Sequence, residues 1–562
     1  MKDMIRVGNC SGFYGDRISA MREQLQGGEL DYLTGDYLAE LTMLILGKDV
    51  LKDASTGYAK TFLRQAEDTL GLALDKGVKI VNNAGGLNPA GLVARLEQIV
   101  PGAKIAYITG DQRSIPGALT ANAYLGAFGI SRALTEGADV VITGRVTDAS
   151  VIVGPAIAEF GWGYDDLDPL AGAVVAGHII ECGTQCCGGN FAGFKDLLAA
   201  GRLDKPIGFP IAEIRPDGSC VITKHDGTGG AVTIDTVTAQ LVYEIGSHRY
   251  LGPDVTTRLD TVQLSRQGPD RIEVSGVTGE RPPASLKVGI NTIGGMRNSV
   301  EFVVTGLDID EKVAWIRSQF QPQAEVVDWS LSTHPPLDAD SEEAASALLR
   351  CTVQDADADV VGRRFAGAAV ELALASIPGF HLTAPPGPAS PFGVFSAEYA
   401  DREPGGIGQS VVIGETPIDI ADPTEFATDS SPTGYRPTPY PGVTDSLTRR
   451  APLGSFVFAR SGDKGGAANL GLWVANDGAA CREDRITWLT KLITPRKIRE
   501  LIPEAADLEV EVFTFPNIGA VNVMIHGLLG RGVAASTRFD PQAKGLGEYV
   551  RSRIVNIQED LL

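Results

Sequence analysis

The chain has 562 residues, of which 43% are hydrophobic and 21% charged, so it is longer than one hydrophobic core usually supports and has the composition of a folded protein. Asp and Glu number 70 against 49 Lys and Arg, and the net charge of −21 opposes a general attraction to nucleic acid or to an anionic membrane. An anionic substrate therefore requires a local basic pocket.

The cellular location is predicted from the amino terminus and the cysteines. Met1–Gly8 is charged and lacks the apolar stretch of a secretory signal, and no apolar run has the length of a membrane span. Seven cysteines in so long a chain are typical of reduced thiols rather than of a disulfide framework. We expect a cytoplasmic protein without membrane or nucleic-acid partners, and a homo-oligomer from base rates.

From Ile5 to about Ala200, short apolar strands end in glycine-rich polar turns and are followed by helical patterns. This alternation predicts an α/β fold with a mainly parallel sheet and flanking helices. We favour an open three-layer arrangement, with a closed barrel as the alternative. The predicted strands are Ile5–Val7, Val78–Asn82, Lys104–Thr109 and Asp139–Thr143, and the predicted helices are Asp36–Leu46, Pro89–Ile99 and Leu119–Glu136.

The pattern changes after residue 205. Residues 205–305 are strand-rich, with alternating apolar residues in Ala231–Thr238 and Ser299–Thr305, and predict an insertion or subdomain within a first domain of residues 1–430. Helical patterns return at Glu311–Phe320 and Ser341–Leu349.

A proline-rich segment over residues 431–451 predicts a stiff linker, because four prolines within Ser431–Gly442 cannot continue a helix or a central strand. Residues 452–562 then predict a small α+β domain. Its predicted strands are Ser455–Ala459, Leu470–Ala475, Leu508–Phe515 and Ala520–Ile525, and its predicted helices are Thr494–Ile502 and Leu546–Ile557.

Two glycine-rich turns follow predicted strands near the amino terminus. In GNCSGFYGDR, Asp16 offers a carboxylate and Arg17 an anion-binding guanidinium, although a surface ion pair on a glycine turn is the alternative. In NNAGGLNP, Asn83 and Asn88 could orient a carbonyl beside a helix amino terminus, or Asn88 could simply cap that helix. Ligands of parallel sheets bind at the carboxyl ends of the strands, where both turns would lie.

Two further segments carry candidate acid–base residues. In TGRVTDAS, Arg145 and Asp148 stand three residues apart and could divide anion binding and proton transfer, or form a salt bridge. In GHIIECGTQCCGGNF, Glu181 sits on an apolar segment where burial would raise its pKa and suit it to acid or base catalysis. Cys182 is a possible nucleophile, and Asn190 a possible substrate contact.

A further candidate segment, ARSGDKGGAAN, lies in the predicted carboxy-terminal domain. Arg460 and Lys464 place two positive charges on a glycine turn of an acidic protein, which suits a carboxylate or a coenzyme A phosphate, and Asp463 could position the lysine. A solvated hairpin is the alternative. We predict no metal site, because the spacing of Cys182, Cys186 and Cys187 is not a usual zinc pattern.

Several of these motifs together resemble the acyclic terpene utilization (AtuA) family. The resemblance implies an α/β amino-terminal domain and a small ferredoxin-like carboxy-terminal domain, and a pathway that degrades citronellol- and geraniol-type acids as coenzyme A thioesters. Cys186 and Cys187 depart from the family pattern. The motifs are SGFYGDR (Ser11–Arg17), DYLAELTM (Asp36–Met43), NAGGLNP (Asn83–Pro89), TGRVTDAS (Thr143–Ser150), the ECG and GGNF of Glu181–Phe191, and RSGDKGG (Arg460–Gly466).

We therefore predict a lyase of hydratase or dehydratase type acting on a branched acyl-CoA thioester or a small carboxylic acid, with coenzyme A entering as part of the substrate and no tightly bound cofactor. Glu181 is the first candidate for acid or base, with Asp16 or Asp148 second; Arg17, Arg145 and Lys464 would bind the anion. The alternatives are acyl transfer or hydrolysis through Cys182, and a non-catalytic subunit that binds a partner.

Overall fold

The computed structural model describes residues 2–402, 408–414, 416–428 and 447–562, and the chain forms two units. The first unit comprises the residues up to Asn291, Phe395–Val533 and Gln542–Leu562; the second comprises Thr292–Val394 and Ala534–Pro541. Two of the four points at which the chain passes between the units lie in the long strands β14 (Ser285–Thr305) and β18 (Ser390–Asp401), and the other two flank residues 534–541. Every candidate catalytic or binding residue belongs to the first unit.

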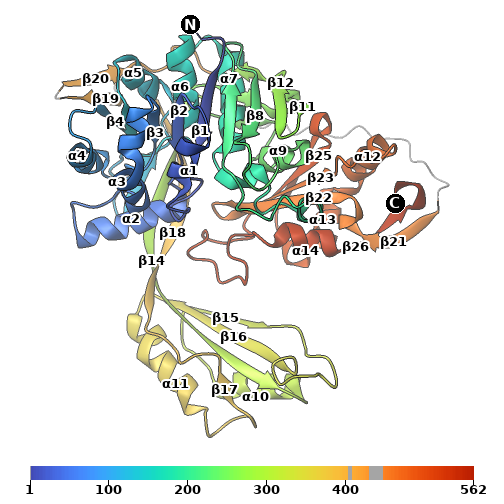
Figure 1. Cartoon of the computed structure of the whole chain (residues 1–562). Helices are drawn as coiled ribbons and strands as arrows, with labels where there is room; N and C mark the ends of the chain where they lie inside the picture. The colour runs from blue at the N-terminus through green and yellow to red at the C-terminus, as the bar shows by residue number, and fades with distance from the viewer. Residues whose placement is uncertain (1, 403–407, 415, 429–446) are drawn as a thin grey trace. The chain divides into compact units, whose positions relative to one another are not determined.

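A parallel core lies at the centre of the large sheet of the first unit (Figure 1). Its strands are short and apolar, and nearly every residue in them is buried, as is expected of parallel strands covered on both faces. In spatial order they are β1 (Ile5–Asn9), β2 (Tyr32–Gly35), β3 (Lys79–Asn82), β6 (Val140–Thr143) and β4 (Ile105–Thr109).

The sheet as a whole is mixed, which corrects the prediction of a mainly parallel sheet. Antiparallel strands extend the parallel core on both sides to a total of 11 strands. The prediction failed because these outer strands come from segments far along the chain, whose hydrogen-bond partners local sequence does not reveal. Beside β1 follow β7 (Pro210–Ile214), β8 (Cys220–Lys224), β12 (Arg271–Ser275) and β11 (Gln263–Gly268); beside β4 follow β19 (Gln409–Ile413) and β20 (Thr416–Ile420).

Helices cover both faces of the parallel core, in the open three-layer arrangement that we favoured over a barrel (Figure 1). Successive residues of a strand face opposite layers: Ile80 packs with one helical layer and Val81 with the other. One layer contains α1 (Ala20–Gly27), α3 (Lys60–Asp75) and α4 (Pro89–Ile99), and the other contains α5 (Phe128–Thr135), α6 (Ser150–Phe160) and α7 (Leu167–Ile180).

The strands predicted in the first 150 residues are confirmed to within two residues at each end, but two other predictions are wrong. Leu119–Glu136 is not one helix, because β5 (Thr120–Ala123) pairs with β14 before α5 begins. Ala231–Thr238 is not a strand. Instead, the Thr233 hydroxyl accepts a hydrogen bond from the Thr236 amide, and this capping box starts α9 (Ile234–Leu241).

Further short elements complete the first unit. The predicted helix Asp36–Leu46 begins later, at Glu40, as α2 (Glu40–Lys52). Residues 205–291 of the strand-rich section lie in the first unit. The remaining elements are α8 (Phe194–Ala199) and a small sheet of β13 (Thr278–Glu280), β10 (Thr256–Arg258) and β9 (Arg249–Leu251).

The carboxy-terminal part of the first unit contains a four-stranded antiparallel sheet with helices. Of the linker predicted over 431–451, residues 431–446 lie outside the described residues, and β21 (Thr448–Pro452) pairs with β26 (Ile554–Gln558). The predicted helix Leu546–Ile557 is therefore too long, because β26 follows α14 (Leu546–Ser552). The sheet order is β22 (Val457–Lys464), β23 (Ala467–Val474), β25 (Ala520–Ile525) and β24 (Val510–Phe515), with α12 (Arg482–Leu492) and α13 (Pro495–Leu501).

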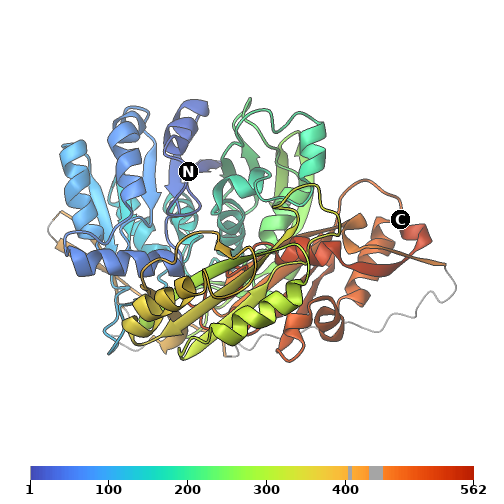
Figure 2. The same ribbon diagram turned by 90° about the horizontal axis from the view of Figure 1, so that it is seen from below.

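The second unit is a sheet with two helices packed on one face (Figure 2). Its strands β15 (Val326–Leu331), β16 (Ser346–Asp355), β14 and β17 (His381–Leu382) share an apolar core with α10 (Ile309–Gln319) and α11 (Phe365–Glu371). The helix predicted over Ser341–Leu349 is wrong, since Ser346–Asp355 is paired with both β14 and β15.

Candidate active site

The carboxyl ends of neighbouring parallel strands bring three polar residues together. Asp36 follows β2, Asn83 follows β3 and Arg145 follows β6. The Asn83 amide nitrogen donates to Asp36 Oδ1 over 2.5 Å, and its oxygen accepts the amide of Tyr37 over 2.8 Å. Asn83 is thus buried and oriented by the chain itself, and it fixes the position of the Asp36 carboxylate.

Arg145 and Asp148 form the ion pair that the sequence offered as one alternative. Arg145 Nη1 lies 2.8 Å from Asp148 Oδ1, and the guanidinium lies over the Tyr124 ring at 4.2 Å. The arginine is buried, whereas the Asp148 side chain remains 26% exposed. The pair therefore presents a carboxylate to solvent with a buried positive charge behind it.

The end of α7 is held against the end of β1. Asn9 Nδ2 donates to the carbonyl oxygens of Ile180 and Glu181 over 2.8 and 3.0 Å. Gly12 approaches so closely that a Cβ on it would lie 2.5 Å from the carbonyl carbon of Cys182. These contacts fix the backbone that carries Glu181 and explain the glycine of the SGFYGDR segment.

Glu181 is a buried carboxyl group whose environment favours the protonated form. Its Oε1 lies 3.2 Å from His178 Nδ1, and among the described residues its buried Oε2 has no hydrogen-bond partner. Burial, followed by the charges of Asp148 and Glu244, raises the Glu181 pKa well above its usual range. Burial and the charge of Lys464 lower the His178 pKa to about 4. These two shifts favour an uncharged acid beside an uncharged imidazole.

The carboxy-terminal sheet contributes Lys464 to the same region. Lys464 ends β22 and donates from Nζ to the Glu244 carbonyl oxygen over 2.5 Å. Burial, and then the positive charge of Lys287, lower the Lys464 pKa. The residues whose charges act on one another here form what we call the polar centre: Asp36, Arg145, Asp148, Glu181, Glu244 and Lys464.

A second ion pair borders the polar centre. Lys287 on β14 lies 3.3 Å from Glu40 at the start of α2, and its Nζ lies over the Tyr124 ring at 4.6 Å. Burial opposes ionisation of Glu40, but the charges of Lys287 and Arg145 lower its pKa to about 2. Three cationic side chains, Arg145, Lys287 and Lys464, therefore meet in this otherwise acidic protein.

Sequence reasoning missed several residues of this region. Asp36 follows an apolar strand and a glycine, as Arg145 does, so the same strand-end signal could have identified it. Glu40, Glu244 and Lys287 follow no such signal. They come from a helix start, a loop after α9 and a long strand, and only the fold brings them together.

Three predicted residues have structural partners instead. Arg17 binds Glu23 and the Ile207 carbonyl oxygen and lies over the Phe209 ring. Asp16 accepts hydrogen bonds from the amides of Gly12 and Arg17, and burial raises its pKa. Asn88 accepts from the Gly91 amide and caps α4. The structure thus places these three outside the polar centre, and Asn88 in the capping role that was the alternative.

The other predicted residues of the carboxy-terminal domain lie beside the polar centre. Arg460 Nη1 donates to the Asn190 carbonyl oxygen over 3.0 Å, and Arg460 is buried against Gln185 and the Tyr243 ring. The Asn190 side chain is exposed. Burial and the charge of Glu244 raise the Asp463 pKa to about 7. Arg460 joins the two domains rather than facing solvent as a phosphate site would.

The environment of Cys182, the candidate nucleophile, does not activate its thiol. Burial and the charge of Glu244 raise the Cys182 pKa well above its usual range, which disfavours the thiolate that a nucleophile needs. Cys186 and Cys187 are buried. Across the described ranges, no group of three or more His, Cys, Asp or Glu residues is arranged to hold a metal ion.

No helix within the described residues combines the length and apolarity needed to cross a membrane. No curated protein and no solved structure matches the chain. Two family models do match: the acyclic terpene utilisation family protein AtuA over residues 5–116 and 113–404, and the AtuA ferredoxin-like domain over residues 451–556. The first description concerns the use of terpenes and indicates a metabolic enzyme. The chain belongs to the acyclic terpene utilisation (AtuA) family, as its turn motifs predicted.

Proposed function

We propose that the protein is a hydratase- or dehydratase-type lyase that acts at the polar centre on a branched acyl thioester or a small carboxylic acid. The observation that carries the proposal is Glu181, a buried carboxyl near the partly exposed carboxylate of Asp148, with one oxygen that no group in the described part of the chain hydrogen-bonds. A carboxyl that burial keeps protonated, beside a second carboxyl that is open to solvent, is an arrangement that can divide acid and base roles.

The two carboxyl groups supply the proton transfers of a dehydration. Asp148 removes the proton next to the substrate carbonyl, while the protonated Glu181 donates its proton to the departing hydroxyl group. The C–H and C–O bonds break, a C=C bond forms, and one water leaves. Asp148 then passes its proton to solvent and Glu181 takes one up. Hydration is the same sequence in reverse.

The cationic residues would hold the anionic part of the substrate. Lys464 donates one hydrogen bond to the chain and retains further N–H donors for a carbonyl or carboxylate oxygen. Such donors stabilise the negative charge that develops on that oxygen as the neighbouring proton leaves. Acyl transfer through Cys182 gains no support, because the environment of the thiol disfavours the thiolate.

The test is incubation of the purified protein with a panel of branched acyl-CoA thioesters and the matching free acids, followed by mass analysis of each compound. We expect a mass change of one water in at least one compound, abolished in Glu181→Gln. Comparing thioester with free acid decides whether coenzyme A is part of the substrate. Binding without mass change across the panel would contradict the lyase, and an acyl adduct on Cys182 would replace it with acyl transfer.

A further inference from the structure

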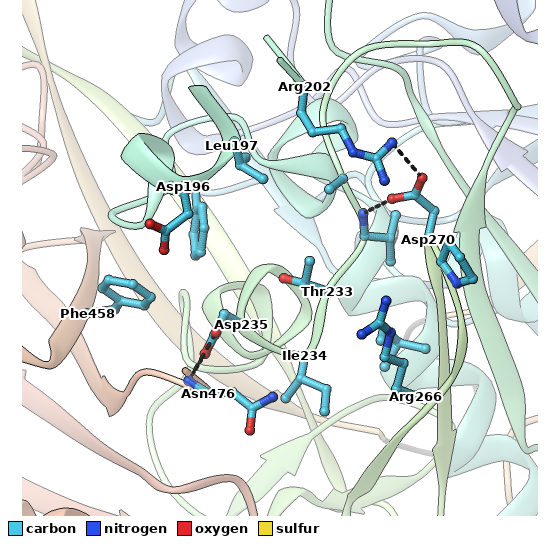
Figure 3. A pocket seen from close by; sticks show the side chains of 15 residues that line it. Asp196, Leu197, Arg202, Thr233, Ile234, Asp235, Arg266, Asp270, Phe458 and Asn476 are labelled. Carbon is cyan, nitrogen blue, oxygen red and sulfur yellow. Dashed lines mark hydrogen bonds and ion pairs between the residues drawn. The ribbon is translucent and has the colours of Figure 1, made fainter. Parts of the chain in front are cut away.

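The first unit contains a cavity of about 250 Å³ that the polar centre does not use (Figure 3). It is smaller than the pockets of about 300–1,000 Å³ that hold drug-sized ligands, so its volume suits a small molecule. Its walls come from four places in the chain: α8 with the residues that flank it, the start of α9, the hairpin of β11 and β12, and the carboxy-terminal sheet with Asn476.

Much of the wall is apolar. Phe191 and Phe458 meet edge to face with ring centroids 5.4 Å apart, and Leu197, Val232 and Ile272 line the cavity as buried side chains. Such a surface favours a compact hydrocarbon body over a sugar or a phosphate chain.

One end of the cavity is basic. Arg202 lies 3.2 Å from Asp270, and Lys224 approaches the same Asp270 carboxylate at 3.8 Å. Arg266 also lines this end; its Nε makes only a 3.4 Å hydrogen bond to Gly268, and within the described ranges its guanidinium has no ion-pair partner. Arg202 and Lys224 thus share the Asp270 carboxylate, whereas Arg266 has no carboxylate partner among the described residues and is available to an anion.

Two further acidic residues line the cavity, and within the described residues neither forms an ion pair with Arg202 or Arg266. Asp235 accepts hydrogen bonds from Trp473 Nε1 and the Asn476 amide, so the protein already uses its oxygens, and burial raises its pKa to about 6. Asp196 lies across the cavity from Arg266, beside the Phe458 wall (Figure 3). Asp196 and Phe458 therefore lie on the side of the cavity opposite Arg266.

The cavity is distinct from the polar centre. Along β22, Phe458, Arg460 and Lys464 alternate with residues of the carboxy-terminal core and face the α/β part of the unit. Phe458 lines the cavity and Lys464 belongs to the polar centre. Six residues of strand separate them by about 20 Å, since each residue advances about 3.3 Å.

We propose that this cavity is a second binding site, for a small organic carboxylate with a compact apolar body. The carboxylate binds between Arg202 and Arg266, and the body packs on Phe191 and Phe458. Because Phe458 belongs to the carboxy-terminal domain and the arginines to the α/β part, an occupied site joins the two parts and stabilises the folded chain. The proposal does not depend on the lyase.

The experiment uses three probes that share one body: cyclohexylacetate, cyclohexylacetamide and 2-cyclohexylethylamine. Calorimetric titration of the full chain at pH 7.5 should show the carboxylate binding most tightly, with a matching rise in Tm. Arg266→Gln should weaken carboxylate binding about tenfold, because a hydrogen-bonded charge pair is lost. The control Arg22→Gln removes an equal charge from α1 and should leave binding unchanged.

The variant Lys464→Gln tests whether the carboxylate binds in this cavity or at the polar centre, to which Lys464 belongs. We expect it to leave carboxylate affinity within error of the unaltered chain. The proposal is overturned if the amide binds as tightly as the acid, if the amine binds better than both, if none of the probes binds at millimolar concentration, or if Lys464→Gln rather than Arg266→Gln removes binding.

Discussion

The polar centre and the glycine turn Gly8–Arg17 contain the same kinds of residue on the same edge of the sheet, but the protein uses them differently. In the turn, Asp16 accepts two backbone amides, and Arg17 is paired with Glu23. In the polar centre, Glu181 keeps an unpartnered buried oxygen among the described residues, and Asp148 faces solvent. Residue type on a glycine turn thus does not by itself single out a candidate acid or base; the unused hydrogen-bonding capacity of Glu181 is what distinguishes it from Asp16.

The largest expected effect is that of Glu181→Gln on turnover. Removing an acid–base group should lower kcat by about 10²–10⁴-fold, measured on the compound found by the panel. Thermal unfolding should show little loss of stability, because burial favours the uncharged carboxyl and glutamine is its neutral isostere. Asp16→Asn is the matched control in the glycine turn and should keep kcat within threefold or so. An equal loss of kcat in both variants would show that the glycine turn and the polar centre do not differ in their part in turnover.

Next in size is a pH effect at the edge of the polar centre. The Asp463 pKa is raised to about 7 in the folded chain, so between about pH 4 and pH 7 the unfolded chain loses this proton while the folded chain keeps it. Stability therefore falls as pH rises through this window.

Asp463→Asn removes this contribution, so its stability relative to the unaltered chain should rise by on the order of 3 kcal/mol from pH 4 to pH 7.5. Urea unfolding across that range measures the difference. Asp68→Asn is the control, because the exposed Asp68 beside Arg22 has its pKa lowered rather than raised. If the stability difference between Asp463→Asn and the unaltered chain did not change with pH, the Asp463 carboxyl would be solvated rather than buried.

A smaller effect is expected from replacing two glycines by alanine, one in close contact with its neighbours and one in an open position on a helix. Gly12→Ala places a methyl group 2.5 Å from the Cys182 carbonyl carbon and should cost about 2 kcal/mol in unfolding free energy, with displacement of Glu181 also lowering turnover. Gly71→Ala in α3 meets no atom within 4 Å and should instead stabilise the chain by about 1 kcal/mol. If both glycines tolerate alanine equally, the end of β1 does not hold α7 in place.

The smallest expected effect concerns the helix cap. Asn88→Ala removes the acceptor for the Gly91 amide and should lower stability by about 1 kcal/mol without changing turnover. Asn88→Asp keeps the acceptor but loses the donor to the Ser55 and Thr56 carbonyl oxygens. The difference in stability between Asn88→Asp and Asn88→Ala therefore measures the capping hydrogen bond. A change in kcat for Asn88→Ala would return this residue to the substrate-binding role that the sequence also allowed.

Local pattern predicted much of the parallel core. The strands at Ile5, Lys79, Ile105 and Val140 are apolar runs that end at polar or glycine residues, and the helix at Pro89 begins with a proline and a capping asparagine. The errors fall where a partner distant in sequence decides the structure. Thr120–Ala123 and Ser346–Asp355 are strands because β14 pairs with both, and no local signal distinguishes them from helices.

The sequence by itself determined the α/β class, the family, and the segments that carry Arg145, Asp148, Glu181 and Lys464, because glycine-rich turns next to apolar segments are local features. Only the tertiary structure decided which charges meet. Glu244 joins the polar centre, and the Glu40–Lys287 ion pair borders it, from separate segments of the chain. Arg17 instead forms an ion pair with Glu23. The physical reason is that the pKa of a group and the partners of its polar atoms depend on burial and on neighbours in space, which sequence spacing does not record.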